Sequence, residues 1–295
     1  MWIAAPYISI EHKSAPWLLM STISAYGLLL CGLYVPVLSA LVQDWWQDPD
    51  YSHGFLIPFL VGVFLWQGRA ALHSLRPCPS LWGIVGVAGG MGLLLLGTFG
   101  AELFLMRLSF VVTLTALVLL HAGGAVLRAL WFPLAYLLFM IPLPALVYNA
   151  VAFPLQLVAA NVSADILHLL HIPVFREGNI ISLTFVTLEV NEACSGIRSL
   201  ASLSALTVIF AQWTQPTPLK KLMVTFSALP ITIVTNVTRV VVTGILANYV
   251  NVSLAQGFFH AFSGWVVFIA AFVLLGLVGR LCRTFDVEYH ERSII

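Results

Sequence analysis

Residues 103–120 read LFLMRLSFVVTLTALVLL, an apolar stretch whose only charge is Arg107. A helix needs about 20 predominantly apolar residues to cross the hydrocarbon core of a bilayer, so this stretch predicts a membrane-spanning helix. The rest of the chain has the same character, since 60% of its 295 residues are hydrophobic and 8% are charged, against about 25% charged in soluble domains. This composition excludes a soluble enzyme, and the net charge of +1 argues against nucleic-acid binding.

Seven further apolar runs, separated by charged or Pro/Gly-rich breaks, predict additional spanning helices. They cover residues 17–41, 55–67, 82–99, 129–141, 199–213, 222–242 and 261–281. The second, fifth and sixth spans along the chain are short, and we expect each to extend by a turn or to lie within protein. The sequence therefore predicts an all-α polytopic membrane protein with about eight transmembrane helices. We expect one membrane-embedded domain over residues 1–295, with a core over about 17–283 and a short tail over 284–295.

Gly86 and Gly90 form a GxxxG pair within the third predicted span. In membranes this spacing places two small residues on one helix face and lets a second helix approach closely. We therefore expect the pair to serve helix packing and not phosphate binding.

Basic residues gather in alternate connecting segments, as expected when positive charge is retained on the cytoplasmic side. Placing the amino terminus in the cytoplasm assigns nine of the thirteen Lys and Arg residues to cytoplasmic segments. These nine are Lys13, Arg69, Arg76, Arg128, Lys220, Lys221, Arg280, Arg283 and Arg292. The opposite face then receives most of the acidic residues. We therefore expect both termini to be cytoplasmic.

Residues 142–193 form the one sizeable segment outside the predicted spans, and the charge bias places this insertion on the outward face. Within it, residues 145–170 have helical composition but carry Gln156, Asn161 and Asp165, so we expect an amphipathic helix at the membrane surface. Short β-rich runs then flank a Glu-Gly-Asn turn at 177–179. This pattern predicts a small β-hairpin.

Ionisable side chains cost at least about 2.5–3.5 kcal/mol at the centre of a spanning helix, so each one near a span is a functional candidate. Glu192, Cys194 and Arg198 cluster where the insertion enters the sixth predicted span. A thiol in the first turn of a helix feels the positive end of the helix dipole, and Arg198 also favours the nucleophilic thiolate. The alternatives are an apolar packing role for Cys194 and an interfacial role for Arg198.

Two later segments add a fixed cation and a proton carrier on the same predicted face. Asn236 and Arg239 lie in the seventh span, with Arg239 toward its outer end, and His260 opens the eighth. Arginine is permanently charged and holds an oxyanion, whereas histidine exchanges a proton near neutral pH. A cysteine, a base and a fixed cation suffice for acyl transfer. The alternatives are an arginine that locks two helices through an ion pair and a histidine satisfied at the interface.

His53 lies in Asp-Tyr-Ser-His-Gly, residues 50–54, at the outer mouth of the second predicted span. It is either a second acid or ligand on this face or part of a turn that caps a helix. The sequence contains no HExxH, GxSxG or Walker motif, which disfavours zinc hydrolysis and ATP-driven transport. We expect no metal and no other cofactor.

Taken together, these motifs resemble the exosortase/archaeosortase family of polytopic cysteine transpeptidases. The resemblance covers about residues 50–265, and the run around Cys194 is its most specific part. It rests on Tyr-Ser-His-Gly at 51–54, Arg-Glu-Gly-Asn at 176–179, Glu-Ala-Cys-Ser-Gly-Ile-Arg-Ser at 192–199, Asn-Val-Thr-Arg at 236–239 and His260. The family's proposed Cys–Arg–His triad maps to Cys194, Arg239 and His260. We assign supporting or substrate-binding roles to Arg198, Glu192, Asn236, His53 and Arg176.

The resemblance also implies substrates and a location. Substrates of the family are exported proteins that end in a short Pro-Glu-Pro-type motif, one membrane helix and a basic tail. The implied location is the bacterial inner membrane, in contact with membrane lipid and with the active site on the periplasmic face. Bacterial members often accompany exopolysaccharide gene clusters, so a link to that biosynthetic machinery is a further hypothesis.

The implied reaction is cleavage of the sorting signal by Cys194, with Arg239 stabilising the oxyanion and His260 protonating the leaving amine. Whether water or an amine accepts the acyl group is left open by the sequence. Arg198 and the hairpin around Arg176 are hypothesised to contact the motif's carboxylate or its extended backbone. The rival interpretation is a non-enzymatic membrane component of exopolysaccharide export. Such a glycan path should cross the bilayer, whereas the ionisable residues here gather on the predicted outer side.

Overall fold

Helices dominate the structure, a computed structural model that describes residues 16–184, 187–190, 197–249 and 258–292. Among these residues, seven helical segments are long and apolar enough to cross a membrane, and a shorter apolar helix covers Ala201–Thr214. Helices suit a bilayer because they satisfy every backbone hydrogen bond within one segment. The predicted all-α polytopic membrane fold is therefore confirmed.

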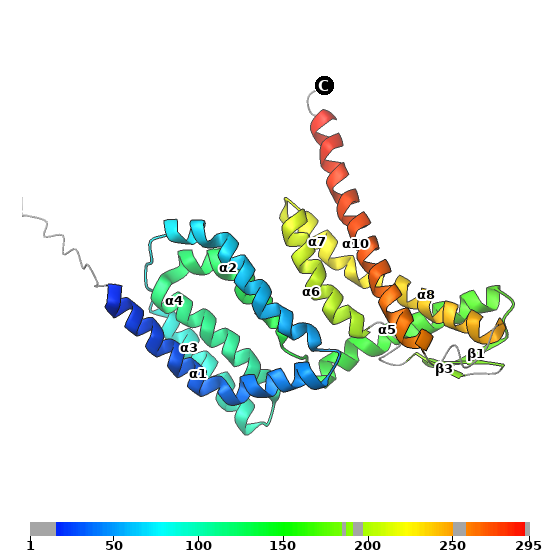
Figure 1. The fold of residues 1–295 in the computed structure, drawn as a ribbon, viewed down its shortest axis with the longest axis horizontal. Coiled ribbons are helices and arrows are strands. Elements are labelled where there is room, and N and C mark those ends of the chain that lie inside the picture. The colour runs from blue at the N-terminus through cyan, green and yellow to red at the C-terminus, as the bar shows by residue number, and fades with distance from the viewer. Residues whose placement is uncertain (1–15, 185–186, 191–196, 250–257, 293–295) are drawn as a thin grey trace, which may run out of the picture.

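The first half of the chain, coloured blue to green in Figure 1, forms one bundle of helices. Its elements are α1 (Pro16–Gln47), η1 (Ser52–Phe55), α2 (Leu56–Ser74), α3 (Trp82–Phe99), α4 (Leu103–Tyr136) and η2 (Leu137–Met140). A buried polar network joins α1 to α4, since the hydroxyl of Tyr34 lies 3.1 Å from the hydroxyls of both Ser109 and Thr113. This network fixes the position of α1 along the axis of α4.

The long helix α4 reverses direction at Gly123. The φ of Gly123 is 82°, in a region that favours glycine, and the helix is interrupted at that residue. Both ends of α4 consequently return to the end of α1. Arg107 near the start of α4 donates to Asp44 at 2.6 Å, and the indole of Trp45 donates to the carbonyl of Met140 at 2.9 Å. The two spans predicted for this region are thus two limbs of one kinked helix.

Small residues let α3 pack tightly against the first limb of α4. A side chain added at Gly86 would meet the methyl group of Ala116, and one added at Gly90 would meet the side chain of Thr113. The α3 helix can approach this closely only because both positions lack a Cβ. The predicted helix-packing role of the GxxxG pair is confirmed.

The contacts divide the first bundle into two opposite ends. At one end the rings of Tyr26 and His121 lie 4.5 Å apart, and the amide of Cys78 donates to the carbonyl of Ala122. Asp44, with its Arg107 and Met140 neighbours, lies at the other end. This separation agrees with the loops that the charge bias assigns to opposite sides. Which end faces the cytoplasm stays a prediction.

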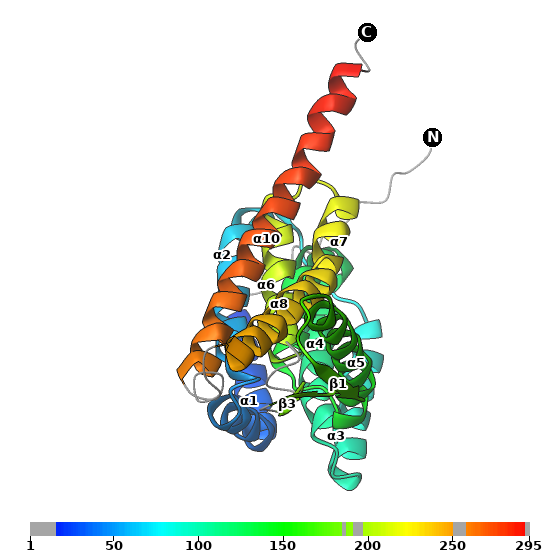
Figure 2. The same cartoon turned by 90° about the vertical axis from the view of Figure 1, so that its right-hand side faces the viewer.

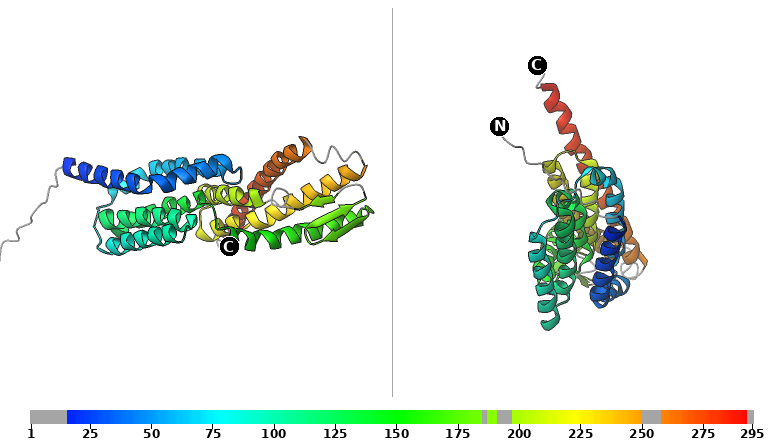
Figure 3. Two further views of the ribbon diagram at one scale, coloured as in Figure 1. Left: turned by 90° about the horizontal axis from the view of Figure 1, so that it is seen from below. Right: turned by 90° about the vertical axis from the view of Figure 1, so that its left-hand side faces the viewer.

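The second half of the chain forms a second group of helices with a small sheet, which Figures 1 and 3 show at the other end of the elongated molecule. Its elements are α5 (Ala145–Leu169), β1 (Val174–Glu177), β2 (Ile180–Leu183), β3 (Thr187–Glu189), α6 (Ile197–Thr214), α7 (Pro218–Phe226), α8 (Ala228–Tyr249) and α10 (Phe258–Arg292).

The three strands pair antiparallel in the order β1-β2-β3. The first pair turns at Gly178, whose φ of 62° suits the tight connection between Glu177 and Ile180. Buried side chains of β2 pack with α5 and α8 in one apolar core, which includes Ile181, Leu167 and Val240. The predicted hairpin is therefore present, with a third strand added along β2.

The segment predicted to be an amphipathic surface helix differs in the structure. Helix α5 is 25 residues long, is apolar enough to cross a membrane, and packs lengthwise on α8. Its small residues Ala159 and Ala160 are buried in the core shared with α8, while Val162 and Leu169, about one turn before and after the exposed Asp165, are also exposed. Apolar and polar side chains therefore share the exposed face, which is not the arrangement of a surface helix.

The last two predicted spans have different limits in the structure. The seventh is divided at Ser227 into α7 and α8, whereas the eighth is part of α10 and begins earlier and ends later than predicted. Figure 2 shows α10 rising past α6 and α7 to its end. The expected tail is thus helical as far as Arg292.

Candidate active site

The predicted site residues divide into three groups. Cys194 and Glu192 lie outside the described residues. Arg198 and His260 lie in the first turns of α6 and α10, and the helical backbone is described there while their side chains are not. The side chains of Arg239, Asn236, His53 and Arg176 belong to the described structure.

Three helices that carry predicted residues meet one another. Helix α8, which holds Arg239, contacts both α6 and α10. Cys194 precedes the start of α6 by three residues, and a chain of that length spans at most about 11 Å. The α6 helix, which begins three residues after Cys194 in the sequence, lies directly against the helix that carries the arginine.

Arg239 lies near the middle of α8 and is half-buried. Its carbonyl accepts a hydrogen bond of 2.8 Å from the hydroxyl of Thr243, one turn later. Asn236 lies one turn earlier and is 1% exposed. Residues three apart on a helix are neighbours on its surface, so Asn236 and Arg239 share one side of α8.

The carboxamide of Asn236 is buried with an unused donor and an unused acceptor. Neither its Nδ2 nor its Oδ1 has a hydrogen-bond partner in the part of the chain that the structure describes. A buried polar group without a partner costs about 1–3 kcal/mol, so such groups are rare in proteins and call for an explanation. One turn before Arg239, Asn236 thus carries both a hydrogen-bond donor and an acceptor that no described residue engages.

The His-Gly pair at 53–54 owes its position to Trp45. Gly54 lies so close to the Trp45 indole that a Cβ at residue 54 would overlap the ring. The short helix η1 can therefore lie directly on α1. His53 is half-buried, and its Nδ1 lies 3.1 Å from the carbonyl of Asp50. The turn-capping interpretation of this motif thus has structural support, and the ring is held in one place.

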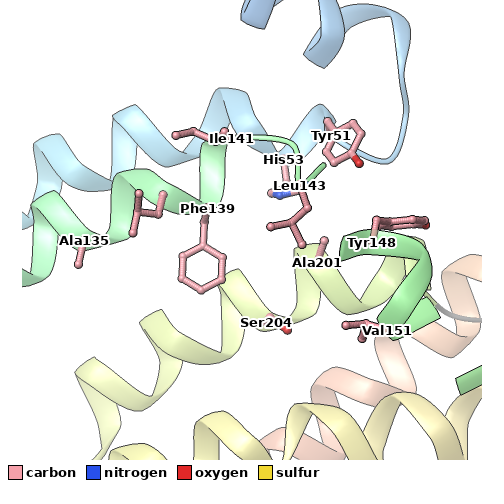
Figure 4. A pocket seen from close by; sticks show the side chains of 11 residues that line it. Tyr51, His53, Ala135, Phe139, Ile141, Leu143, Tyr148, Val151, Ala201 and Ser204 are labelled. Carbon is pink, nitrogen blue, oxygen red and sulfur yellow. The ribbon is translucent and has the colours of Figure 1, made fainter. Parts of the chain in front are cut away.

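His53 lies on the wall of a cavity of about 440 Å³. Figure 4 shows the cavity between η1, the end of α4 with η2, the first turns of α5, and α6. Aromatic and aliphatic side chains form most of its lining, and the lining residues with a polar group are Tyr51, His53, Tyr148 and Ser204. Helix α6 contributes Ala201 and Ser204, so the helix that begins next to Cys194 also forms one wall.

Helix α6 is held against the first bundle by contacts at its middle and near its C-terminal end. The hydroxyl of Tyr136 donates to the carbonyl of Ala205 at 3.2 Å, and the indole of Trp213 donates to Gln67 at 3.3 Å. These contacts fix the wall that carries Ala201 relative to α4 and α2. The cavity is therefore a junction between the two halves of the chain.

Arg176 lies apart from this cavity and has a local contact. It is exposed on β1, and its guanidinium donates to the carbonyl of Gly178 at 2.8 Å. This bond closes the turn between β1 and β2. The structure thus gives Arg176 a role in the hairpin, and its hypothesised contact with substrate stays untested.

The sequence singles out Arg107 as a charge in an apolar stretch but does not identify Asp44 as its ion-pair partner. Arg107 is 3% exposed and pairs with Asp44 at 2.6 Å. The signal available in the sequence was the lone charge in the apolar stretch 103–120, because a buried charge needs a counter-charge. Asp44 precedes the segment that carries His53, so the pair anchors that end of α1.

A family model described as transmembrane exosortase matches residues 45–277. The matched range contains every motif from Tyr51 to His260. No match was found among curated proteins, and none among solved structures.

Proposed function

Because this chain belongs to the transmembrane exosortase family, we propose that it is a membrane cysteine peptidase or transpeptidase that cuts a C-terminal sorting signal from exported proteins. The observation that carries the proposal is the contact of α8 with both α6 and α10. These three helices hold Arg239 and the first-turn residues Arg198 and His260, and α6 begins three residues after Cys194.

Cys194 is the proposed nucleophile. Its thiolate attacks the carbonyl carbon of the cleaved peptide bond, and the former carbonyl oxygen becomes an oxyanion. Thiolate is favoured near a helix N-terminus and near a guanidinium, and along the sequence Cys194 precedes the start of α6 by three residues and Arg198 by four. Arg198, in the first turn of α6, is the nearest arginine along the chain and is proposed to support the thiolate. Glu192 is proposed to support the same segment.

Arg239 is the proposed oxyanion ligand. It is half-buried in α8, where fewer water molecules compete for its donors than in open solvent. The amide of Asn236, one turn away and without a hydrogen-bond partner among the described residues, is proposed to supply a further donor and acceptor for the peptide group of the substrate. A carboxamide matches a peptide group because both carry one carbonyl acceptor and N–H donors.

His260 is the proposed proton donor to the leaving amine. When the tetrahedral intermediate collapses, the C–N bond breaks, the amine takes the proton, and the acyl group stays on Cys194 as a thioester. An amine then gives transpeptidation, and water gives hydrolysis. Attack of either acceptor on the thioester breaks the C–S bond, the acceptor's proton passes to the histidine, and Cys194 leaves as the thiolate.

The proposed substrates are exported proteins that carry a short Pro-Glu-Pro-type motif, a membrane helix and a basic tail. The proposed place of cleavage is the outer face of the bacterial inner membrane, where an exported chain and the end of its helix are both accessible. A connection with exopolysaccharide production belongs to the same proposal.

The test is to co-express the protein with such a substrate and to determine the mass of the substrate's C-terminus. Cys194→Ala should abolish processing, because it removes the nucleophile while changing little volume. Cys31→Ala, Cys78→Ala and Cys282→Ala are matched controls, since these free thiols lie elsewhere in the structure. Processing that persists in Cys194→Ala, starting from a confirmed uncleaved pool, would overturn covalent catalysis by this residue.

A further inference from the structure

We propose that the 440 Å³ cavity beside His53 is the specificity pocket for an uncharged, apolar part of the sorting signal next to the bond that is cut. The inference rests on the proposed function and adds the chemical class of residue that the enzyme selects. It follows from the lining of the cavity, its position relative to α6, and its charge.

The lining has the composition of a pocket for an apolar ligand with a few polar groups. Phe139 and Ile141 lie on one side of the cavity in Figure 4, Tyr51 and Tyr148 lie toward the other, and His53 lies between them. Ligand pockets are typically about 300–1,000 Å³ and combine apolar walls with a small number of placed polar groups. The cavity therefore has room for a short peptide segment, with its side chains against the apolar side.

The position of the cavity relates it to the proposed nucleophile. Ala201 and Ser204 of α6 form one wall, and Ala201 lies seven residues after Cys194. Three residues of chain, even if fully extended, and one turn of helix together span at most about 17 Å. A peptide a few residues long can therefore reach from the cavity to the cysteine.

The lack of charged side chains among the described lining residues favours a peptide over a phospholipid headgroup as the occupant. Among the described residues that line the cavity, none is Lys, Arg, Asp or Glu. Phospholipid headgroups carry phosphate and are recognised through basic side chains, so a headgroup would have no counter-charge here. Uncharged peptide groups need only hydroxyl and imidazole partners, and the lining residues Tyr51, Tyr148, Ser204 and His53 carry such groups.

The placement of His53 fits a recognition role. The carbonyl of Asp50 lies 3.1 Å from its Nδ1, and Gly54 sets η1 directly on Trp45. A polar group fixed in this way loses little conformational freedom when a ligand binds. We therefore assign to His53 a hydrogen bond with the bound segment and no part in the proton transfer.

The test changes the size of the pocket at positions that leave the buried core unchanged. Ala135→Leu adds bulk inside the cavity. Its matched control is Ala129→Leu, at a residue that is likewise exposed on the same limb of α4 but lies outside the cavity lining. Leu143→Ala enlarges the cavity, and Leu146→Ala, 84% exposed and not part of the lining, is its control. Each variant is assayed in membranes on two sorting-signal reporters that differ only in a small or a bulky residue beside the mapped cleavage site.

Ala135→Leu should lower kcat/KM for the bulky reporter by about 10–200-fold, the range for steric discrimination by an apolar pocket, mainly through KM. Leu143→Ala should shift preference toward the bulky reporter, and both controls should behave as wild type. If wild type cuts neither reporter, the proposed function fails. If wild type cuts them and all four variants keep its preference, the pocket assignment is wrong.

Native mass spectrometry of the purified wild type and Ala135→Leu tests the alternative occupant, a phospholipid. A phospholipid that is retained by wild type and lost from Ala135→Leu, with cleavage of both reporters unchanged, would overturn the proposal and identify a lipid site. Loss of bulky-reporter cleavage with unchanged lipid content supports the peptide pocket.

Discussion

Arg107 shows how one residue organises the site end of the first bundle. Its guanidinium is buried in α4 and pairs with Asp44 of α1, whose side chain is 38% exposed. The backbone carbonyl of Asp44 in turn accepts from Asp48 at 2.9 Å, in the turn that leads to η1 and His53. The ion pair therefore fixes the position of the segment that leads to His53 in the cavity wall.

Asp44→Asn should destabilise the protein by leaving the Arg107 cation without its counter-charge. Breaking a fully buried pair costs about 3–5 kcal/mol, and the partial exposure of Asp44 reduces the expected loss to about 1–2 kcal/mol. Thermal unfolding in detergent measures this loss of stability. The double variant Asp44→Asn with Arg107→Met should regain most of the stability, because no buried charge remains. A single variant as stable as wild type would contradict this account.

Arg239→Lys should keep the protein folded but remove most of its activity. Lysine retains a positive charge that could hold two helices together, yet it lacks the planar fork of donors that holds an oxyanion. Loss of one oxyanion donor costs about 10²–10³ in rate. The measurement is the processing rate of a sorting-signal substrate at matched membrane abundance. A rate near wild type would assign Arg239 to structure and point to Arg198 as the oxyanion ligand.

At the level of elements, glycines decide how α3 and α4 are shaped and packed. Gly83, Gly86 and Gly90 bring α3 against the first limb of α4, and Gly123 lets α4 turn back beside α2. The second limb then ends next to Trp45 and forms the apolar side of the cavity. Gly90 and Gly123 each have a neighbouring glycine with open space, Gly89 and Gly124, which provides a control.

Gly90→Leu should separate α3 from α4 and reduce the amount of folded protein. A Cβ at residue 90 meets Thr113, and overpacking of this kind costs about 1–3 kcal/mol. Gly89→Leu is the matched control, because no atom lies within 4 Å of a Cβ at that residue. Gel filtration after heating should show loss of the monodisperse peak for Gly90→Leu alone. Equal behaviour of the two variants would show that the helices do not pack through Gly90.

Gly123→Ala should destabilise the reversal of α4. The φ of 82° is unfavourable for residues with a side chain, at a cost of about 1–3 kcal/mol, and a Cβ there would also meet the carbonyl of Cys78. Gly124→Ala, which has open space around its Cβ, should be tolerated. Apparent melting temperatures in detergent compare the two. A lower melting temperature for Gly124→Ala than for Gly123→Ala would place the turn elsewhere.

At the scale of the whole molecule, two ends and a junction define the arrangement. Cys78 and His121 lie at one end of the first bundle, whereas Asp44 and Met140 lie at the other. The cavity lies at the second end, where α6 joins the two halves of the chain. An enzyme that acts on exported proteins requires this end to face outward.

Membrane-impermeant thiol labelling tests that orientation. Cysteines introduced at Asp48, Glu177 and His260 should react in intact cells, and those at Arg76, Arg128 and Lys220 should react only after permeabilisation, because this assignment satisfies the bias of basic residues. Since α5 is long enough to cross a membrane, Glu177 also reports whether it does so. An inward-facing Glu177 with an outward-facing Asp48 would put the sheet on the opposite side from the cavity and contradict the proposed site.

The sequence by itself determined the membrane class, most helices and the packing role of Gly86 and Gly90. These features are local, because a span must satisfy its own backbone hydrogen bonds and show an apolar surface to lipid. The charge bias and the motifs from His53 to His260 are equally local, so the predicted site residues could be named without a fold.

Only the tertiary structure decided which of these segments meet. The partner of Arg107, the packing of α5 on α8 and the cavity between η1, η2 and α6 depend on contacts between residues far apart in the chain. An apolar helix can bury several different faces, and hydropathy carries no record of which one is chosen. That choice depends on single features such as the Gly123 turn, the Tyr136 hydroxyl and the small residues of α5, whose partners exist only in the folded chain.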